Sequence, residues 1–472
     1  MLRSLTPFAL AALVAVMPAA AEQTDILDPA IRAQAVALME AGLQDDVGLE
    51  FTESLTTEIG PRLAGSDAEW RARQWAMIKL KDLNFQQAYI EDFNIPYWER
   101  VTETASVVGP NRQKLIVTAL GGSTSTAKGG VEAEIVRFTS LSDLQAAPID
   151  SLTGKIAFID ERMVRTQDGS GYGAAVAQRG GCAEAAAAIG AVACLIRSVG
   201  TDDHRMPHTG GMRRDGASGA LPAAALSPPD ADQLARLLER GPVTVNLNIQ
   251  VTTSASAASG NVIAEVEGAS RKDEIVLIGC HLDSWDLGTG AIDDAAGCGI
   301  VVAAANLIQQ LPGKPKRTIR VVLYGAEEVG LFGGRAYATA HADELDKHVL
   351  AAESDFGAGR IWRLKSGVAD GALDYVAAMQ DVVAPLGIVP AENNSRGGPD
   401  IMVLSASGVP VLEPGQDGTD YFDLHHTPDD TFDKIDPAAF RQNVAAYAAL
   451  TYLAAQTDWD FRKAAAPESE DQ

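Results

Sequence analysis

Five short segments in the second half of the chain each bring acidic or histidine residues directly after an apolar run or a glycine-rich turn. In chain order they contain His281 with Asp283, Asp293 with Asp294, Glu327 with Glu328, Glu353 with Asp355, and His425 with His426. Three of the apolar runs, 275–279, 320–324 and 348–352, have the composition of buried strands. Because functional groups in open α/β sheets gather beyond the carboxyl ends of the strands, we expect the charged groups to meet at one edge of a sheet.

Strand and helix patterns alternate through the same half of the chain. The predicted elements are strands 261–267, 274–279, 318–324 and 348–353 and helices 295–311, 333–347, 371–384 and 437–456. Nearer the N-terminus, residues 28–39 and 66–83 have the apolar spacing of helices, and the second opens with a capping box, Ser66-x-x-Glu69. This alternation predicts an α/β fold in which helices cover a mixed central sheet on both faces.

The chain changes character after residue 111, where it begins an alternation of its own. We expect strands 130–138, 155–159, 192–196 and 243–251, helices 173–189 and 228–238, and a loop rich in Gly, His and Arg at 201–219. Two strands, 86–95 and 101–108, precede this segment, and the Ala- and Ser-rich residues 254–260 mark the return to the first pattern. The predicted division is a larger discontinuous domain, 22–111 and 254–462, a small inserted domain, 112–253, and a polar tail, 463–472.

Residues 1–21 have the order of a secretory signal: a basic Arg3, an apolar run, and small residues at 18–21 before an acidic stretch. The apolar run is too short to span a bilayer, and we expect no other stretch to span one. A membrane anchor is therefore the less favoured alternative. The mature chain is predicted to carry no membrane anchor and to be periplasmic or secreted.

The charge and the cysteine content narrow the classes of partner. A formal net charge of −25 argues against nucleic acid, whose binding needs a basic surface. Export permits disulfides, but small buried side chains would suit the surroundings of the four cysteines equally well, so their pairing stays open. These are Cys182, Cys194, Cys280 and Cys298. Cys280 is not counted as a metal ligand, because the groups around it are hard carboxylates.

The imidazole and carboxylate groups match the ligands of a catalytic zinc site, which keeps one position open for water. Two zinc ions need a bridging group, which Asp293 can supply. The predicted ligands for two Zn²⁺ are His281, Asp293, Glu328, Asp355 and His426. Glu327 then remains as a general base, and Asp283 as an acceptor that orients a ligand. Taken singly, the Glu327–Glu328 pair also resembles a solvated helix start, and either Asp293 or Asp294 can cap the following helix.

Residues 281–297, which contain the first two of these segments, resemble the first metal motif of the co-catalytic dizinc exopeptidase family, of the aminopeptidase S and glutamate carboxypeptidase type. Within that family they are most similar to the plasma glutamate carboxypeptidase (carboxypeptidase Q) subgroup. The further matching segments are 60–66, 207–210, 325–331, 353–356 and 425–431. The resemblance implies the zinc exopeptidase fold, with a protease-associated domain as the insert, and relatives with this insert often form homodimers.

The resemblance also implies a role for each matching residue. His281 and Asp355 would hold one zinc, Glu328 and His426 the other, with Asp293 as the bridge and Glu327 as the base. His426 is preferred to His425 because the family places this ligand four residues before the Asp of Asp-Thr, here Asp430. His425 takes the place of a Tyr that stabilises the oxyanion in some relatives. Arg396 lies where relatives have a substrate-contacting Arg, and Asp294 where many have Asn.

The expected function is that of an exported, zinc-dependent exopeptidase acting on dipeptides or short peptides. An aminopeptidase, a dipeptidase and a carboxypeptidase all remain open. The alternatives are a non-catalytic, receptor-like relative that binds peptides and a glutaminyl-cyclase-like acyl transferase with one zinc. Among the other histidines, His204 is assigned to a loop, His341 and His348 to the ends of a surface helix, and His208 is a candidate for the mouth of the site.

Overall fold

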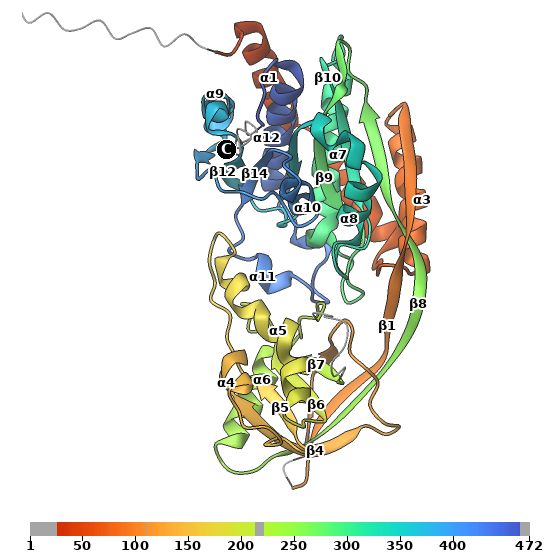
Figure 1. Cartoon of the computed structure of the whole chain (residues 1–472), viewed down its shortest axis with the longest axis vertical. Coiled ribbons are helices and arrows are strands. Elements are labelled where there is room, and N and C mark those ends of the chain that lie inside the picture. The colour runs from red at the N-terminus through yellow and green to blue at the C-terminus, as the bar shows by residue number, and fades with distance from the viewer. Residues whose placement is uncertain (1–25, 111, 213–220, 463–472) are drawn as a thin grey trace, which may run out of the picture.

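The computed structural model describes residues 26–110, 112–212 and 221–462. Figure 1 shows two parts that are joined along one side by a ribbon of two long strands. The larger part has helices on both faces of a mixed sheet, which confirms the expected fold class. The predicted signal at 1–21, the tail at 463–472 and the end of the 201–219 loop lie outside the described residues.

Strands from distant parts of the sequence form the sheet of the larger part. From one edge inward, its order is β13 (Val389–Pro390), β12 (Ile361–Gly367), β14 (Val411–Gln416), β11 (His348–Glu353), β9 (Arg271–His281), β10 (Arg317–Tyr324) and β8 (Thr244–Val266). The neighbours β11, β9 and β10 run parallel, so their carboxyl ends lie at the same edge. This confirms the prediction that three apolar strands end together.

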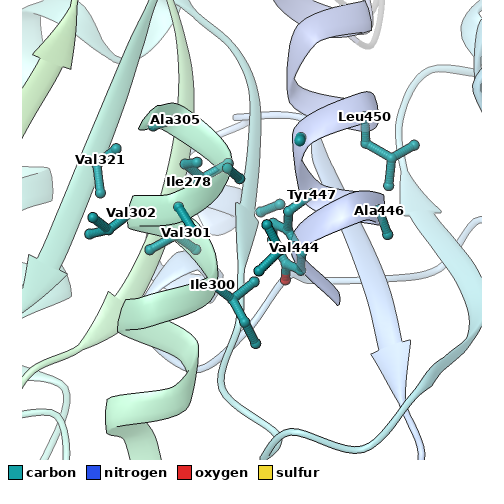
Figure 2. Close-up of a cluster of buried hydrophobic side chains, with 14 of the residues drawn as sticks. Ile278, Ile300, Val301, Val302, Ala305, Val321, Val444, Ala446, Tyr447 and Leu450 are labelled. Atoms are coloured by element: carbon teal, nitrogen blue, oxygen red, sulfur yellow. The ribbon is translucent and has the colours of Figure 1, made fainter. Parts of the chain in front are cut away.

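The two faces of this sheet bury alternate residues of each strand. On β9, Val276 and Ile278 contact one layer of helices, whereas Ile275 and Leu277 contact the other. The first layer contains α1 (Pro29–Gly42), α2 (Val47–Ser54), α3 (Asp67–Asp82), α7 (Ala296–Gln309), α9 (Leu373–Val383) and α12 (Pro437–Gln456). The second contains α8 (Phe332–Ala340) and α10 (Ile401–Ala406). Figure 2 shows α7 and α12 packing together beside Ile278.

Local sequence signals set where several of these helices begin. Ser66 caps α3 by accepting a hydrogen bond from the Glu69 amide, as the capping box predicts. The Glu69 carboxylate reaches back to the Gly65 amide. Asp436 caps α12, whose first residue is the favourable Pro437.

One stretch of the described residues, Ala291–Gln309, is long and apolar enough by composition to cross a membrane, against the expectation that no stretch after residue 21 would be. Of its most apolar window, 94% is buried inside the fold, where α7 packs between the sheet, α2 and α12. A helix that is apolar on all sides is also what a fully enclosed core position requires, and this is the role of α7 here.

The smaller part carries its own sheet and helices. Its elements include β2 (Gln113–Leu115), β3 (Val117–Ala119), β4 (Val131–Phe138), α4 (Leu141–Gln145), β5 (Ile156–Ile159), α5 (Ser170–Ala188), β6 (Ala193–Arg197), β7 (Ala223–Leu226) and α6 (Pro228–Leu238). Strands β4 to β7 are parallel neighbours in chain order. A disulfide between Cys182 and Cys194 joins α5 to β6, which settles a pairing that the sequence left open.

The ribbon that joins the two parts is longer than predicted. Strand β1 (Gln87–Val108) pairs with β8 over nearly its whole length, with register shifts near Tyr97 and Thr102. The predicted break at 254–260 is wrong, because these small residues pair with β1 inside β8. The predicted domain boundary at 253–254 therefore falls within a continuous strand that runs through both parts.

The predicted helix at 333–347 is also wrong in its second half. α8 ends at Ala340, and a 3-10 helix, Ala342–Lys347, follows it. His348 is not at the surface as predicted: it is fully buried, and its Nε2 lies 2.8 Å from the Tyr337 hydroxyl. The Tyr337 hydroxyl thus provides a hydrogen-bonding partner for the buried ring of His348.

Candidate metal centre and active-site cavity

The predicted ligand residues come from five different connections that converge at one edge of the sheet. His281 is the last residue of β9, Glu328 lies on the turn after β10, and Asp355 follows β11 by two residues. Asp293 lies in the turn Ala291–Ala295 before α7, and His426 follows α11 (Tyr421–Leu424). Each strand therefore positions a functional group at the point where its backbone leaves the sheet.

Asp293 lies between the two histidines. One of its oxygens is 3.0 Å from His281 Nε2, which is also 3.4 Å from an Asp355 oxygen. Its other oxygen is 3.2 Å from His426 Nε2, which is 3.0 Å from Glu328 Oε2. The arrangement thus consists of two imidazole–carboxylate pairs that share one central carboxylate, and all five predicted ligand residues are brought together.

The second ring nitrogen of each histidine faces a backbone carbonyl. His281 Nδ1 lies 3.0 Å from the Asp283 oxygen, and His426 Nδ1 lies 3.2 Å from the Thr209 oxygen. A carbonyl oxygen can accept a hydrogen bond but cannot donate one, so each Nδ1 carries a proton and donates it. In the neutral ring the Nε2 lone pair then faces the carboxylates, which is how proteins orient histidine for metal binding.

Burial and crowding shift the pKa values of the carboxyl groups in opposite directions. Burial would raise the pKa of Asp293, but hydrogen bonds from His281 and His426 hold it well below its usual range. Burial, with repulsion from neighbouring acids, raises the pKa of Glu327, Glu328 and Asp355. Although burial opposes it, Glu328 with Asp293 raises the pKa of His426 to about 9.

These shifts describe a site with a surplus of negative charge. Protons are held on imidazoles because carboxylates surround them, and a divalent cation would neutralise the same charge. Glu328 also has a buried oxygen, Oε1, with no hydrogen-bond partner among the described residues. Imidazole nitrogens and carboxylate oxygens are the donor set that zinc accepts. The residues present therefore fit a metal centre.

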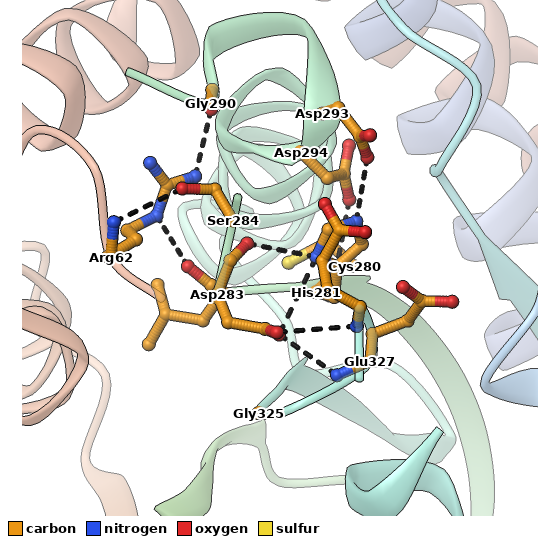
Figure 3. Close-up of polar contacts among 12 residues, drawn as sticks. Arg62, Cys280, His281, Asp283, Ser284, Gly290, Asp293, Asp294, Gly325 and Glu327 are labelled. Carbon is orange, nitrogen blue, oxygen red and sulfur yellow. Dashed lines mark hydrogen bonds and ion pairs between the residues drawn. The ribbon is translucent and has the colours of Figure 1, made fainter. Parts of the chain in front are cut away.

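Asp283 positions the turn that carries the two adjacent glutamates. Its carboxylate accepts a hydrogen bond from the Glu327 amide at 3.0 Å (Figure 3) and another from the Glu328 amide at 3.3 Å. Its backbone carbonyl faces His281 Nδ1, whereas its nearest carboxylate oxygen is 3.7 Å from that nitrogen. The orienting role of the Asp283 side chain stays a prediction. The Glu327 carboxylate lines the cavity and makes no hydrogen bond to another described residue.

A buried arginine that the sequence analysis assigned no role supports the loop between β9 and α7. Arg62 is fully buried, and its guanidinium donates to the carbonyls of Leu282 at 2.5 Å and Thr289 at 2.6 Å. It also donates to the Gly290 carbonyl at 2.8 Å (Figure 3). One planar side chain therefore closes both ends of this loop. Its only sequence signal is its place in the segment 60–66.

Asp430 fixes the other side of the same loop. Its carboxylate accepts from the Ile292 amide at 2.6 Å and from the Asp293 amide at 3.3 Å. Burial raises the pKa of Asp430 to about 7. Asp430, which the sequence analysis used only to choose between His425 and His426, therefore holds the backbone of Asp293 in place.

Asp294 has a different task from its neighbour. The peptide bond between Asp293 and Asp294 is cis, and the Asp294 carboxylate accepts from the His281 amide at 3.1 Å and the Gly297 amide at 3.0 Å. It caps the start of α7, as expected of one member of this pair. Nearby, a disulfide joins Cys280 to Cys298, which agrees with the exclusion of Cys280 from the ligands.

A cavity of about 920 Å³ opens onto the metal centre, which is within the usual size of ligand sites. Both parts of the protein line it. Its wall includes the aromatic residues Trp98, Tyr172, Trp285, Phe332, Phe356, Tyr421 and Phe422, the arginines Arg179, Arg335 and Arg363, and the functional residues Asp293, Glu327, Glu328, Asp355, His425 and His426.

Four predicted residues do not line this cavity. His281 and Asp283 are fully buried and do not reach its wall, and the other two are Arg396 and His208. Arg396 is exposed and lies outside the wall, although the next three residues belong to it. His208 is buried, with Nδ1 2.7 Å from the His425 carbonyl and Nε2 2.7 Å from Asp202. It connects the inserted part to the segment that carries His426 and does not cover the mouth.

His425 lies in the wall of the cavity, stacked on His426 with ring centroids 3.5 Å apart. Its Nε2 is 3.6 Å from Asp293, and its Nδ1 is buried without a hydrogen-bond partner among the described residues. Burial, followed by His426, lowers the pKa of His425 well below its usual value. The His425 ring is therefore neutral, and its oxyanion role stays a prediction.

Comparisons with known proteins identify the family of this chain. The profile of peptidase family M28 matches residues 261–451. Carboxypeptidase Q of Mus musculus is 33% identical over 405 residues, which cover 86% of this chain and 84% of the mouse protein. The chain therefore belongs to peptidase family M28 and is by class a peptide hydrolase. The resemblance to the carboxypeptidase Q subgroup is confirmed.

Solved structures show the same fold. A peptidase M28 precursor from Shewanella amazonensis SB2B has 50% identity and a TM-score of 0.90, covering 92% of this chain and 98% of that one. A zinc aminopeptidase from Bacillus subtilis has 22% identity and a TM-score of 0.64, covering 88% and 95%. At that identity the second comparison concerns the fold alone.

We predict that Arg62→Lys destabilises the protein. Lysine keeps the charge but cannot present a planar fork to the three carbonyls, and each buried acceptor left unpaired costs about 1–3 kcal/mol. The free energy of unfolding should fall by about 2–5 kcal/mol, measured by urea denaturation. The exposed Arg71→Lys is the control and should change it by less than about 0.5 kcal/mol. Equal denaturation midpoints for both variants would contradict the role given to Arg62.

Proposed function

We propose that this chain is an exported, zinc-dependent exopeptidase that cleaves the terminal peptide bond of dipeptides or short peptides. The observation that carries the proposal is the position of Asp293, which directs one oxygen to each of two imidazole–carboxylate pairs. Two zinc ions would be held by His281 and Asp355 on one side and Glu328 and His426 on the other, with Asp293 shared. The cluster of donor atoms from His281, Asp293 and Asp355 supports the first half of this division. The second cluster joins Asp293 to His426 and His425, and Glu328 lies beside His426.

Bound zinc supplies the polarisation of the substrate carbonyl and lowers the pKa of a water molecule. The chain's own residues supply proton transfer and orientation. The Glu327 carboxylate faces the cavity and makes no hydrogen bond to a described residue. It is therefore free to take a proton from water and deliver it to the leaving amine. Asp283 holds the Glu327 and Glu328 amides, which directs these adjacent side chains to different tasks.

The cavity offers partners for both ends of a short peptide. The buried acids at its base suit a free amine, while Arg335 and Arg363 on its wall suit a carboxylate. A dipeptide can satisfy both at once. Export is supported by the order of residues 1–21 and by the two disulfides, which are typical of oxidising compartments.

The two alternative functions have less support. A glutaminyl-cyclase-like acyl transferase would use one zinc, whereas both imidazole–carboxylate pairs are complete here. A receptor-like relative without activity would be expected to have lost a ligand or the base, yet all five predicted ligand residues and Glu327 are present and lie at this cavity or beside Asp293.

We predict that Glu327→Gln lowers kcat on a free dipeptide by about 10²–10⁴-fold, because the amide cannot take a proton. Zinc content, measured by elemental analysis, should stay at the wild-type value because Glu327 is not proposed as a ligand. The exposed Glu239→Gln should keep wild-type turnover. Full activity of Glu327→Gln would remove the proposed general base.

A panel of capped peptides tests the exopeptidase proposal. Free dipeptides should be cleaved fastest, and the corresponding peptides blocked at the amino end, the carboxyl end or both should be cleaved more slowly, with products separated by chromatography. If blocking one end abolishes turnover, that end is the terminus that the enzyme recognises. Cleavage of the doubly blocked peptide as fast as the free one would contradict an exopeptidase.

A further inference from the structure

The inserted part of the chain contributes two residues of α5 to the wall of the catalytic cavity. Tyr172 and Arg179 are seven residues apart, so they lie on the same side of this helix, and both line the cavity. The Tyr172 ring stacks on Phe422 with centroids 4.7 Å apart and meets the edge of His425 at 5.2 Å. The phenol ring is therefore held between the insert and the segment that carries His426.

Arg179 directs its charge toward Tyr172 and the histidine segment. Its side chain is largely buried and makes no ion pair with a carboxylate among the described residues. One terminal nitrogen donates to the Tyr172 hydroxyl at 2.6 Å, and the other lies 3.4 Å from both the Thr209 oxygen and His426 Nδ1. Since His426 Nδ1 carries a proton, the Thr209 oxygen is the acceptor that Arg179 shares with His426.

The proton of the Tyr172 hydroxyl is left available to a molecule in the cavity. The hydroxyl oxygen accepts from Arg179, and no described residue accepts its own proton. Burial raises the pKa of Tyr172 above its usual value, with Arg179 opposing, so the phenol stays protonated at neutral pH. A hydrogen bond from a cation to the oxygen of a hydroxyl polarises the O–H bond and makes it a stronger donor.

We propose that Tyr172, polarised by Arg179, donates a hydrogen bond to the oxygen of the scissile carbonyl as this oxygen gains negative charge. The inserted domain would then supply a catalytic residue, and the active site would be incomplete without it. The inference rests on the proposed peptidase function. Donors aimed at a developing oxyanion give a large part of the rate enhancement in acyl-transfer enzymes.

Two other groups in the cavity are less suited to this task. The Nε2 of His425 faces Asp293, and its Nδ1 is buried, so neither nitrogen is directed freely to a substrate. Tyr421 lines the cavity, but its hydroxyl receives no hydrogen bond from a cationic side chain among the described residues.

The test compares Tyr172→Phe with Tyr421→Phe, which removes the other phenol of the cavity. Tyr172→Phe should lower kcat on a free dipeptide by about 100-fold, change KM by less than about threefold and leave the zinc content unchanged. Tyr421→Phe should lower kcat by less than Tyr172→Phe does. Arg179→Lys should give an intermediate loss, since lysine keeps a charge but not the fork that joins Tyr172 to Thr209.

Binding of a phosphinic dipeptide analogue provides a readout that does not depend on turnover. Its tetrahedral oxygens mimic the transition state, so calorimetry should show about 100-fold weaker binding to Tyr172→Phe, with product amino acids bound as by the wild type. Wild-type kcat in Tyr172→Phe, a larger loss in Tyr421→Phe, or equal weakening of analogue and product would each overturn the inference. If the wild-type enzyme cleaves no peptide, it is the proposed function that fails.

Discussion

The position of Asp293 between His281 and His426 is the interaction on which the rest of this structure depends. A carboxylate at this depth is costly unless cationic or hydrogen-bonding groups surround it. Both of its oxygens face imidazole nitrogens, and Asp430 accepts a hydrogen bond from its amide. Both the carboxylate and the backbone amide of Asp293 thus have defined partners.

Three supports from distant parts of the chain maintain this position. The parallel strands deliver His281, the glutamates and Asp355 to one edge, and Arg62 closes the loop that leads to Asp293. The inserted part provides the Thr209 carbonyl that orients His426. The long ribbon of β1 and β8 connects that part to the sheet, as Figure 1 shows, so folding of the insert and assembly of the site are physically linked.

The sequence allowed His281, Glu328 and Asp355 to be predicted because each lies within a few residues of the end of a recognisable apolar run. Asp293 and His426 instead follow a turn and a short helix. Strand ends are local features, and β11 and α12 have the predicted bounds. The support by Arg62 could not be predicted, since its partners are backbone carbonyls more than two hundred residues away. The same holds for Thr209, whose only contribution to the ligand is its carbonyl oxygen.

Other differences have equally physical causes. Residues 254–260 are small and polar, which is typical of a linker, but pairing with β1 makes them part of a strand. The resemblance placed a substrate-contacting arginine at Arg396, whereas the structure places Arg335 and Arg363 on the cavity wall.

Anomalous diffraction from zinc-loaded crystals, recorded at the zinc absorption edge, tests the central claim most directly. The account predicts two peaks, one beside His281 and Asp355 and one beside Glu328 and His426, with Asp293 next to both. A single peak, or a peak beside Asp294 and the Cys280–Cys298 disulfide instead, would contradict it.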